Sequence, residues 1–191
     1  MAATDYHHGD LRNALVLAGL EILEEDGLGG LTLRKVAARA GVSHAAPAHH
    51  FVNRDGLFVA IATLGFDRFR DYMLEDRYES GRTPQDQLIG ISRGYLRFSR
   101  EQPALFRLNF SVEYKNHPNG ELQAASLRAY QVLADVCALF HPDPAGAGIN
   151  ELKVWSTVHG YAMLSLFQRG QSPDGSPVPI ELLLPTLRPR A

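Results

Sequence analysis

The sequence predicts an all-α protein. Apolar residues recur at spacings of three and four along most of its 191 residues, whereas regular strand-like alternation is hard to find. Apolar residues make up 45% of the chain and charged residues 21%, which is a globular rather than a disordered composition. Residues that start and stop helices separate the periodic segments. We therefore expect several packed helices joined by short turns.

The first four helices are expected before residue 81. Gly27 is expected to end the first helix, because glycine commonly follows the last helical turn. Thr32 is a good N-cap for the second helix, and Gly41 ends it. Ser43 is expected to cap the third helix, and Asn53 the fourth and longer one, which Gly81 ends.

Further helices are expected in the second half. Thr83 and Asp86 have the spacing of a capping box around Pro84. Pro103 opens a short aromatic helix, and the polar stretch 112–120 should be a loop. Longer helices are expected at 121–140 and 150–168, separated by a linker over 141–148. The apolar segment 180–187 should form a short docked helix.

Positive charge is concentrated in one small segment. The chain carries a net formal charge of −2, yet residues 27–54 hold four basic residues, three histidines and no carboxylate. Any nucleic-acid binding must therefore use a local patch, and this segment is the clear candidate. Its pattern is what a helix-turn-helix needs when the second helix enters the major groove of DNA.

The turn within this segment meets the packing needs of a helix-turn-helix. Small residues are needed where two helices cross closely, and Ala37 and Ala38 supply them. Gly41 can adopt the positive φ of the turn because it has no Cβ, and Val42 can fill the space between the helices. The alternative is an ordinary amphipathic helix pair with a glycine turn.

The order of elements resembles the DNA-binding domain of the tetracycline-repressor (TetR) family of bacterial transcriptional regulators. The matching residues are Thr32, Arg34, Ala37, Gly41, Val42, Ser43, His50, Phe51, Arg54, Asp55 and Leu57. A second, weaker resemblance links Trp155, His159 and Gly160 to the Trp-His-Gly (WHG) subgroup of C-terminal domains in that family.

The resemblance implies about nine helices in two domains. Residues 1–54 would form the helix-turn-helix DNA-binding domain, and residues 55–191 the ligand-binding and dimerisation domain. It also implies a homodimer that binds a near-palindromic, double-stranded DNA operator and is released by a small-molecule effector, most often as a repressor. Dimerisation would pair helices 121–140 and 150–168 of two copies into a four-helix bundle.

The same resemblance assigns DNA-contacting residues. They are Thr32, Arg34, Ser43, His44, Ala45, Ala46, Ala48, His49, His50 and Arg54. Hydroxyls, helix N-termini and arginines suit phosphate oxygens, and histidine or alanine can meet base edges and thymine methyls.

The sequence departs from the family pattern at two positions. Pro47 replaces a leucine-like residue, and we expect it to remove a backbone bond to Ser43 and to bend the helix. Ala48 replaces a tyrosine, so we expect weaker non-specific attachment to DNA.

An aromatic set in the second half is a candidate ligand cavity. Most of its members suit the core, but Phe106, Phe110, Trp155 and His159 are candidate ligand contacts. Adjacent histidines point about 100° apart on a helix, so no metal site is expected, and no cofactor. Cys137 lies in an apolar helix and suits inert packing.

We find no sign of a catalytic nucleophile or a phosphate-binding loop, so an enzyme is not expected. The remaining alternative is a helical small-molecule-binding protein or enzyme without DNA-binding function. No secretory signal and no apolar stretch of about 20 residues is visible, so a cytoplasmic protein outside the membrane is expected.

Overall fold

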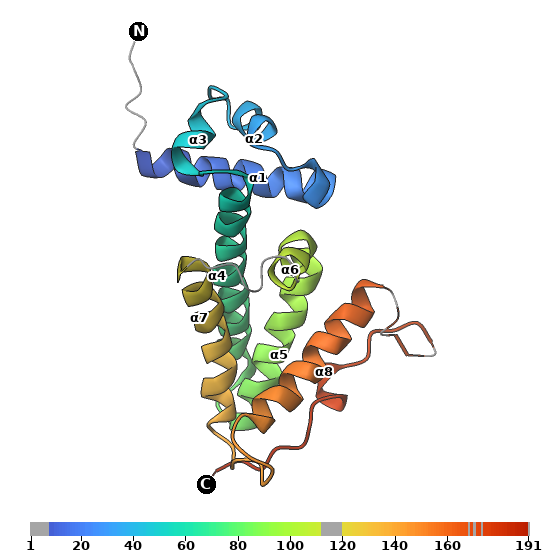
Figure 1. Cartoon of the computed structure of the whole chain (residues 1–191). Coiled ribbons are helices and arrows are strands. Elements are labelled where there is room, and N and C mark those ends of the chain that lie inside the picture. Colours follow the sequence, from blue (N-terminus) through green and yellow to red (C-terminus); the bar gives the residue numbers. More distant parts are fainter. Residues whose placement is uncertain (1–7, 112–119, 168, 170, 173, 191) are drawn as a thin grey trace. The chain divides into compact units, whose positions relative to one another are not determined.

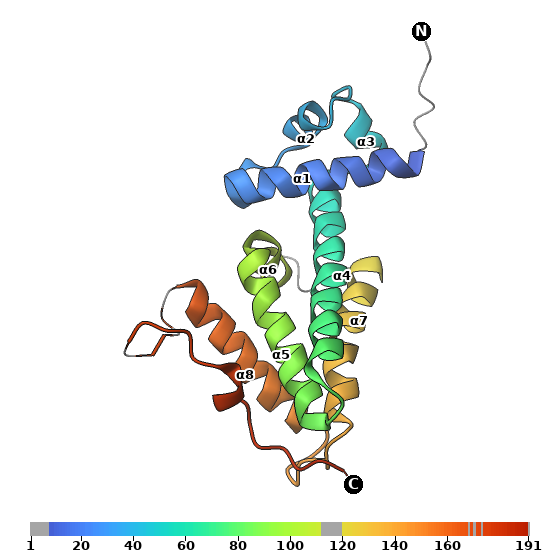
Figure 2. The same ribbon diagram turned by 180° about the vertical axis from the view of Figure 1, so that it is seen from behind.

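A computed structural model describes residues 8–111, 120–167, 169, 171–172 and 174–190. Within these residues the fold is all-α, with eight α-helices and one 3-10 helix, which confirms the predicted class. The helices are α1 (His8–Gly30), α2 (Leu33–Arg39), α3 (Ala46–His50), α4 (Arg54–Ser80), α5 (Pro84–Glu101), α6 (Pro103–Asn109), α7 (Gly120–Cys137), α8 (Ile149–Leu166) and η1 (Ile180–Leu182). Figures 1 and 2 show these helices from opposite sides.

The chain forms two compact units that do not follow its linear order. Unit 1 combines residues 1–65 with 103–123, and unit 2 combines residues 66–102 with 124–191. Helices α4 and α7 therefore contribute residues to both units. The boundary expected after residue 54 falls inside unit 1 and stays a prediction.

Unit 1 is built on α1. Helices α2, α3 and α6 all contact it, and α2 and α3 also contact each other (Figures 1 and 2). Leu15, Leu31, Val36, Leu57 and Ile61 form a core with no exposed surface. The backbone of Gly27 has a φ of 69° and breaks α1, so the predicted end of the regular helix is confirmed and one further turn follows it.

Unit 2 is organised around α5, which packs against α8 and η1. Both halves of the predicted capping box are present: Asp86 N donates to Thr83 Oγ1 at 3.1 Å, and Thr83 N donates to Asp86 Oδ2 at 3.2 Å. Leu88, Ile91 and Tyr95 are buried, as the periodicity predicted.

Some expected boundaries change. The helix expected over 121–140 ends at Cys137, and the helix expected within 180–187 is reduced to the 3-10 turn η1, consistent with the proline at position 185. Of the loop expected over 112–120, residues 112–119 lie outside the described residues, and Gly120 begins α7. No helix in the described part of the chain combines the length and apolar character needed to cross a bilayer.

Candidate DNA-binding and ligand-binding sites

The turn between α2 and α3 has the geometry of a helix-turn-helix. Lys35 N donates to Thr32 Oγ1 at 3.2 Å, which confirms Thr32 as the N-cap of α2. Val42 N donates to Ala37 O at 3.0 Å and closes the turn, while Gly41 has a φ of 69°. That φ lies in the left-handed region, where a Cβ is unfavourable. The predicted role of Gly41 is therefore confirmed.

The start of α3 differs from the prediction. The helix begins at Ala46, its N-cap is Ala45, and no side chain caps it, so the prediction that Ser43 caps α3 was wrong. Ser43 instead accepts a backbone bond from Ala46 N at 3.0 Å in the preceding turn.

This later start also changes the effect of Pro47. The residue lies in the first turn of α3, where a helical N–H has no partner within the helix. The expected loss of a bond to Ser43 and the expected bend were therefore wrong. Pro47 is buried, so it contributes to the packing of α3.

The residues predicted to contact DNA gather on the outer surface of α2 and α3 and at the start of α4. Eight of them are exposed, namely Thr32, Arg34, Ser43, His44, Ala45, Ala48, His49 and Arg54. Ala46 and His50 are half-buried, and the His50 ring lies 6.4 Å from the Phe51 ring. Contact of these residues with DNA stays a prediction.

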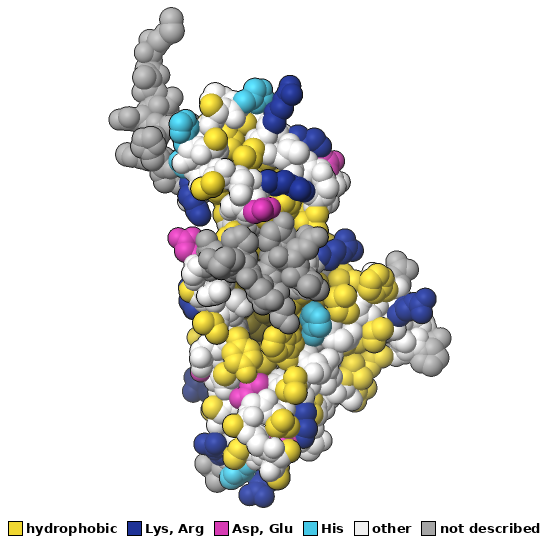
Figure 3. All heavy atoms as spheres, in the orientation of Figure 1, with side chains coloured by type: hydrophobic (Ala, Val, Ile, Leu, Met, Phe, Trp, Pro, Cys, Tyr) yellow, Lys and Arg dark blue, Asp and Glu magenta, His cyan; other side chains and the backbone are white. Residues whose placement is uncertain are grey.

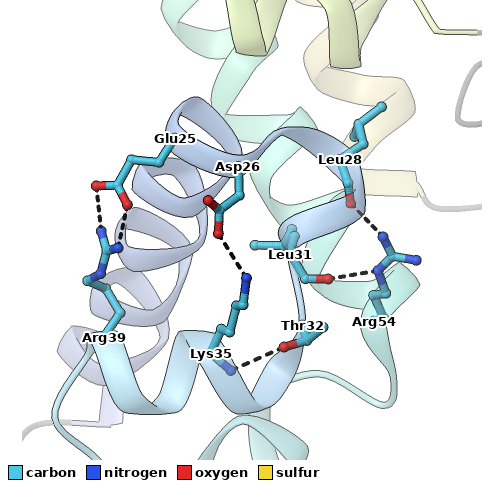
Figure 4. A network of polar contacts seen from close by, with 8 residues as sticks. All are labelled: Glu25, Asp26, Leu28, Leu31, Thr32, Lys35, Arg39 and Arg54. Carbon is cyan, nitrogen blue, oxygen red and sulfur yellow. Dashed lines mark hydrogen bonds and ion pairs between the residues drawn. The ribbon is translucent and has the colours of Figure 1, made fainter.

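Carboxylates of α1 balance much of the positive charge on α2 (Figure 4). Arg39 donates to both Glu25 oxygens at 3.0 and 2.5 Å and to Glu21 at 3.2 Å, and Lys35 Nζ lies 2.8 Å from Asp26. The hydrogen bond from Arg39 lowers the pKa of Glu25, and that from Lys35 lowers the pKa of Asp26. We name these contacts the α1–α2 ion pairs.

Arg54 holds the connection between α1 and α2. Its Nε donates to Leu31 O at 2.9 Å and its Nη2 to Leu28 O at 2.6 Å (Figure 4), and its guanidinium lies 4.7 Å from the centre of the Phe58 ring. Sequence reasoning missed this structural role. Arg34, by contrast, has no ionic partner among the described residues and is exposed.

The candidate ligand contacts belong to two different units. In unit 1, Phe106 is fully buried, Phe110 is half-buried, and their ring centres lie 5.0 Å apart. In unit 2, Trp155 is 39% exposed and His159 is half-buried. Ligand contact by any of the four stays a prediction.

The WHG-like residues of α8 contact a buried tyrosine of α5. Tyr95 Oη lies 2.7 Å from His159 Nδ1, and burial strongly raises the pKa of Tyr95, with an opposing effect from the Trp155 side chain. Burial also lowers the pKa of His159. Both shifts favour the neutral forms, a protonated tyrosine and a neutral imidazole, which share this hydrogen bond. The Trp155 ring in turn lies 6.1 Å from that of Tyr130 on α7.

We expect His159 to make stability pH-dependent. Because its folded-state pKa lies below the ordinary value of 6.5, its contribution is complete above pH 6.5 and is lost as the pH falls below that value. In a His159→Asn variant, which can keep an acceptor near Tyr95 but does not titrate, the free energy of unfolding should fall less below pH 6.5. Denaturant titrations from pH 5 to 8 measure this difference. Parallel curves for the parent and His159→Asn would contradict the assignment.

Cys137 has the character of a packing residue. Its side chain is buried, and burial raises the pKa of the thiol to about 12, so little reactive thiolate is present near neutral pH. Among the described residues, no group of three or more His, Cys, Asp or Glu side chains is placed to hold a metal ion.

Two family descriptions match the chain. Residues 15–61 match "Bacterial regulatory proteins, tetR family", and residues 88–182 match "Tetracyclin repressor-like, C-terminal domain". These ranges take in the helix-turn-helix and most of unit 2, and together they cover most of the chain. The helical architecture and the two matches define a helix-turn-helix transcriptional regulator. The chain belongs to the TetR family of bacterial regulators, which confirms the predicted family and functional class.

Two curated relatives each match less than half of the chain. The chain is 30% identical over 83 residues to the HTH-type transcriptional regulator BetI of Stenotrophomonas maltophilia, covering 44% of this chain and 42% of BetI. It is 32% identical over 88 residues to the class D tetracycline repressor protein of Escherichia coli, covering 46% and 40% of the two chains. The chain thus spans about two fifths of the length of these two relatives.

Solved structures share the fold over nearly the whole chain. A protein of unknown function from Rhodococcus sp. RHA1 aligns with a TM-score of 0.77 at 28% identity, covering 94% of this chain and 93% of that one. A TetR family regulator from Marinobacter aquaeolei VT8 aligns with a TM-score of 0.64 at 21% identity, covering 86% and 87%.

Proposed function

We propose that this chain is a homodimeric repressor that binds a near-palindromic operator and leaves it when a small molecule binds. The observation that carries the proposal is the exposed α2–turn–α3 surface, which combines a capped helix, a glycine turn and the two exposed histidines His44 and His49. In a dimer, the α3 helices of the two subunits would enter successive major grooves about 34–36 Å apart.

Each part of this surface has a role that suits its chemistry. Thr32 and Arg34 at the start of α2 would hold phosphate oxygens, and Ser43 would do so from the turn. His44 and His49 are exposed donors and acceptors that can reach base edges, while Ala45 and Ala48 can lie against thymine methyl groups. We place the sequence preference of the protein in these residues.

An exposed apolar surface on α7 and α8 supports dimerisation. Its members are Leu127, Tyr130, Leu152, Trp155, Met163 and Leu164, which are between 36% and 66% exposed. Figure 3 shows hydrophobic side chains gathered over α8. Contiguous exposed apolar surface marks interaction sites. We call this set the α7–α8 apolar surface and propose that a second copy covers it to form the four-helix bundle.

The WHG-like residues support assignment of the C-terminal part to the WHG subgroup. Trp155 and His159 both interact with the buried Tyr95 and so connect α8 to α5. We call the helix-turn-helix part of each subunit its head. Effector binding can release DNA only if the effector binds one arrangement of the two heads more tightly than the other.

We expect Arg34→Ala to weaken operator binding on the order of tenfold and to lower the slope of log K against log salt by about 2 per dimer, one phosphate contact for each head. Lys35→Ala is the matched control, because Lys35 is already paired with Asp26 and should contribute less to the slope. Fluorescence anisotropy with a duplex from the region upstream of the gene, over several salt concentrations, measures both quantities.

Equal slopes for the two variants would contradict the role of Arg34. A folded protein that retards no duplex at any salt concentration would overturn the repressor itself and favour a helical small-molecule-binding protein. Repeating the titration with candidate metabolites would test effector release.

A further inference from the structure

One buried polar side chain in unit 1 has no hydrogen-bond partner among the residues that the structure describes. Asn109, the last residue of α6, is 7% exposed, and neither its Nδ2 nor its Oδ1 forms a hydrogen bond within the structure. Buried amide groups in proteins are almost always hydrogen-bonded, so each exception calls for an explanation.

The backbone of α4 is shaped to admit this amide. A methyl group on the Cα of Gly65 would lie 2.5 Å from Asn109 Oδ1 and 2.8 Å from Nδ2, so the amide lies against bare main chain. Any larger residue at position 65 would have to displace the amide.

Other buried polar side chains do not share this property. Ser92 Oγ donates to Leu88 O at 2.7 Å, Ser99 Oγ donates to Leu96 O at 2.8 Å, and Asn150 Nδ2 donates to His141 O at 3.0 Å. The fold therefore satisfies buried polar groups elsewhere, and Asn109 is the exception among the four described.

Two aromatic residues lie on either side of Asn109 in the sequence, and its helix packs on the helix that supports the helix-turn-helix. Phe106 and Phe110 come from the same short segment as Asn109, their rings are in contact, and the Phe110 ring is half-buried rather than enclosed. Helix α6 packs directly on α1, the helix that also carries α2 and α3. A molecule held at α6 would thus act within the same compact unit as the helix-turn-helix.

We propose that Asn109 is the polar contact of the effector site and that the effector presents a neutral amide or lactam edge on an apolar body. A carboxamide offers donors and an acceptor side by side, so a ligand must offer an acceptor and a donor in the same arrangement to satisfy both. A carboxylate would satisfy only the donors and would bring an unpaired charge into a buried place. This inference rests on the effector-responsive function proposed above and names the chemistry of its ligand.

A pair of small probes tests this chemistry. Benzamide carries a ring and an amide edge, whereas acetophenone keeps the ring and the carbonyl but has no N–H donor. In a ¹⁵N-labelled sample of the whole chain, benzamide should shift the side-chain NH₂ signals of Asn109, and acetophenone should bind at least tenfold more weakly, because a donor lost in a buried site leaves its partner unpaired.

Matched asparagine variants separate recognition from folding. Asn109→Leu should unfold at the same or a higher temperature than the parent, since it removes an unsatisfied amide, yet bind benzamide at least tenfold more weakly. Asn150→Leu breaks an existing hydrogen bond, so it should unfold at a lower temperature and keep benzamide binding. If Asn109→Leu fails to fold, Asn109→Ala and Gly65→Ala provide the same test of binding.

Equal binding of the two probes, or unchanged benzamide binding in the Asn109 variants, would overturn the proposal. The titration contains no DNA, so its result is independent of the repressor assignment. Benzamide binding at Asn109 in a protein that binds no operator would leave this inference standing and refute the repressor. Operator binding by a protein whose Asn109 signals do not respond to benzamide would support the repressor and refute this inference.

Discussion

Replacing Gly94 by valine should lower the free energy of unfolding by more than about 4 kcal/mol. Losses of this size are exceptional and accompany severe overpacking. A Cβ on Gly94 would lie 2.3 Å from Tyr72 O and 2.7 Å from Met73 Cα, and one on Gly90 would lie 2.7 Å from Asp76 O. These neighbours are main-chain atoms of α4 and cannot rotate aside. The two helices must therefore separate and lose the packing between them.

A thermal unfolding curve followed by circular dichroism measures the effect of Gly94→Val. For a chain of this size, each kcal/mol corresponds to roughly 2–4 °C, so the midpoint should fall by at least about 8 °C. Gly56→Ala is the matched control, because the nearest atoms to a Cβ there lie 3.7 Å away and the site is also helical. That variant should melt at or slightly above the parent midpoint. A Gly94→Val protein that melts with the parent would show that α4 and α5 do not approach this closely.

Leu152→Glu should convert the proposed dimer into monomers at micromolar concentration and reduce operator affinity more than about 100-fold. Leu152 is 57% exposed on α8, within the α7–α8 apolar surface, and two copies facing each other would bury two carboxylates in an apolar interface. After the subunits separate, each DNA molecule is bound by a single head. The increase in affinity of about 10²–10⁴-fold that comes from joining two heads is then lost.

Light scattering at several concentrations and anisotropy with the operator duplex measure the two effects of Leu152→Glu. Tyr78→Glu is the control, because Tyr78 is 78% exposed on α4 and lies outside the α7–α8 apolar surface. It should remain dimeric and bind DNA with parent affinity. Dissociation in both variants, or in neither, would place the subunit contact elsewhere.

Features set by neighbouring residues could be predicted from the sequence. Thr32, Asn53 and Thr83 each bond to a backbone N–H three residues later, so a short stretch of sequence contains the whole interaction. Gly41 was predictable for the same reason, because its positive φ follows from the turn between two adjacent helices. The helical class depended on periodicity, which also lies within short segments.

Contacts between distant residues could not be predicted in this way. Arg39 meets Glu25, fourteen positions earlier, and Arg54 bonds to Leu28, twenty-six positions earlier. A count of charges along the chain shows only that residues 27–54 lack carboxylates. The carboxylates that pair with Arg39 lie just outside that range, on α1. The sequence also could not predict that the buried amide of Asn109 forms no hydrogen bond with the described residues, since burial and hydrogen bonding depend on the complete fold.

The α1–α2 ion pairs have a consequence for how this regulator would search a chromosome. Attraction to DNA of arbitrary sequence depends on cations that can displace counterions from phosphates. Since Lys35 and Arg39 are already paired with carboxylates, each head presents less free positive charge than its composition suggests. We expect shorter residence on unrelated DNA and less sliding along it. The ratio of operator to random-sequence binding, rather than absolute affinity, should then be the property that distinguishes this protein.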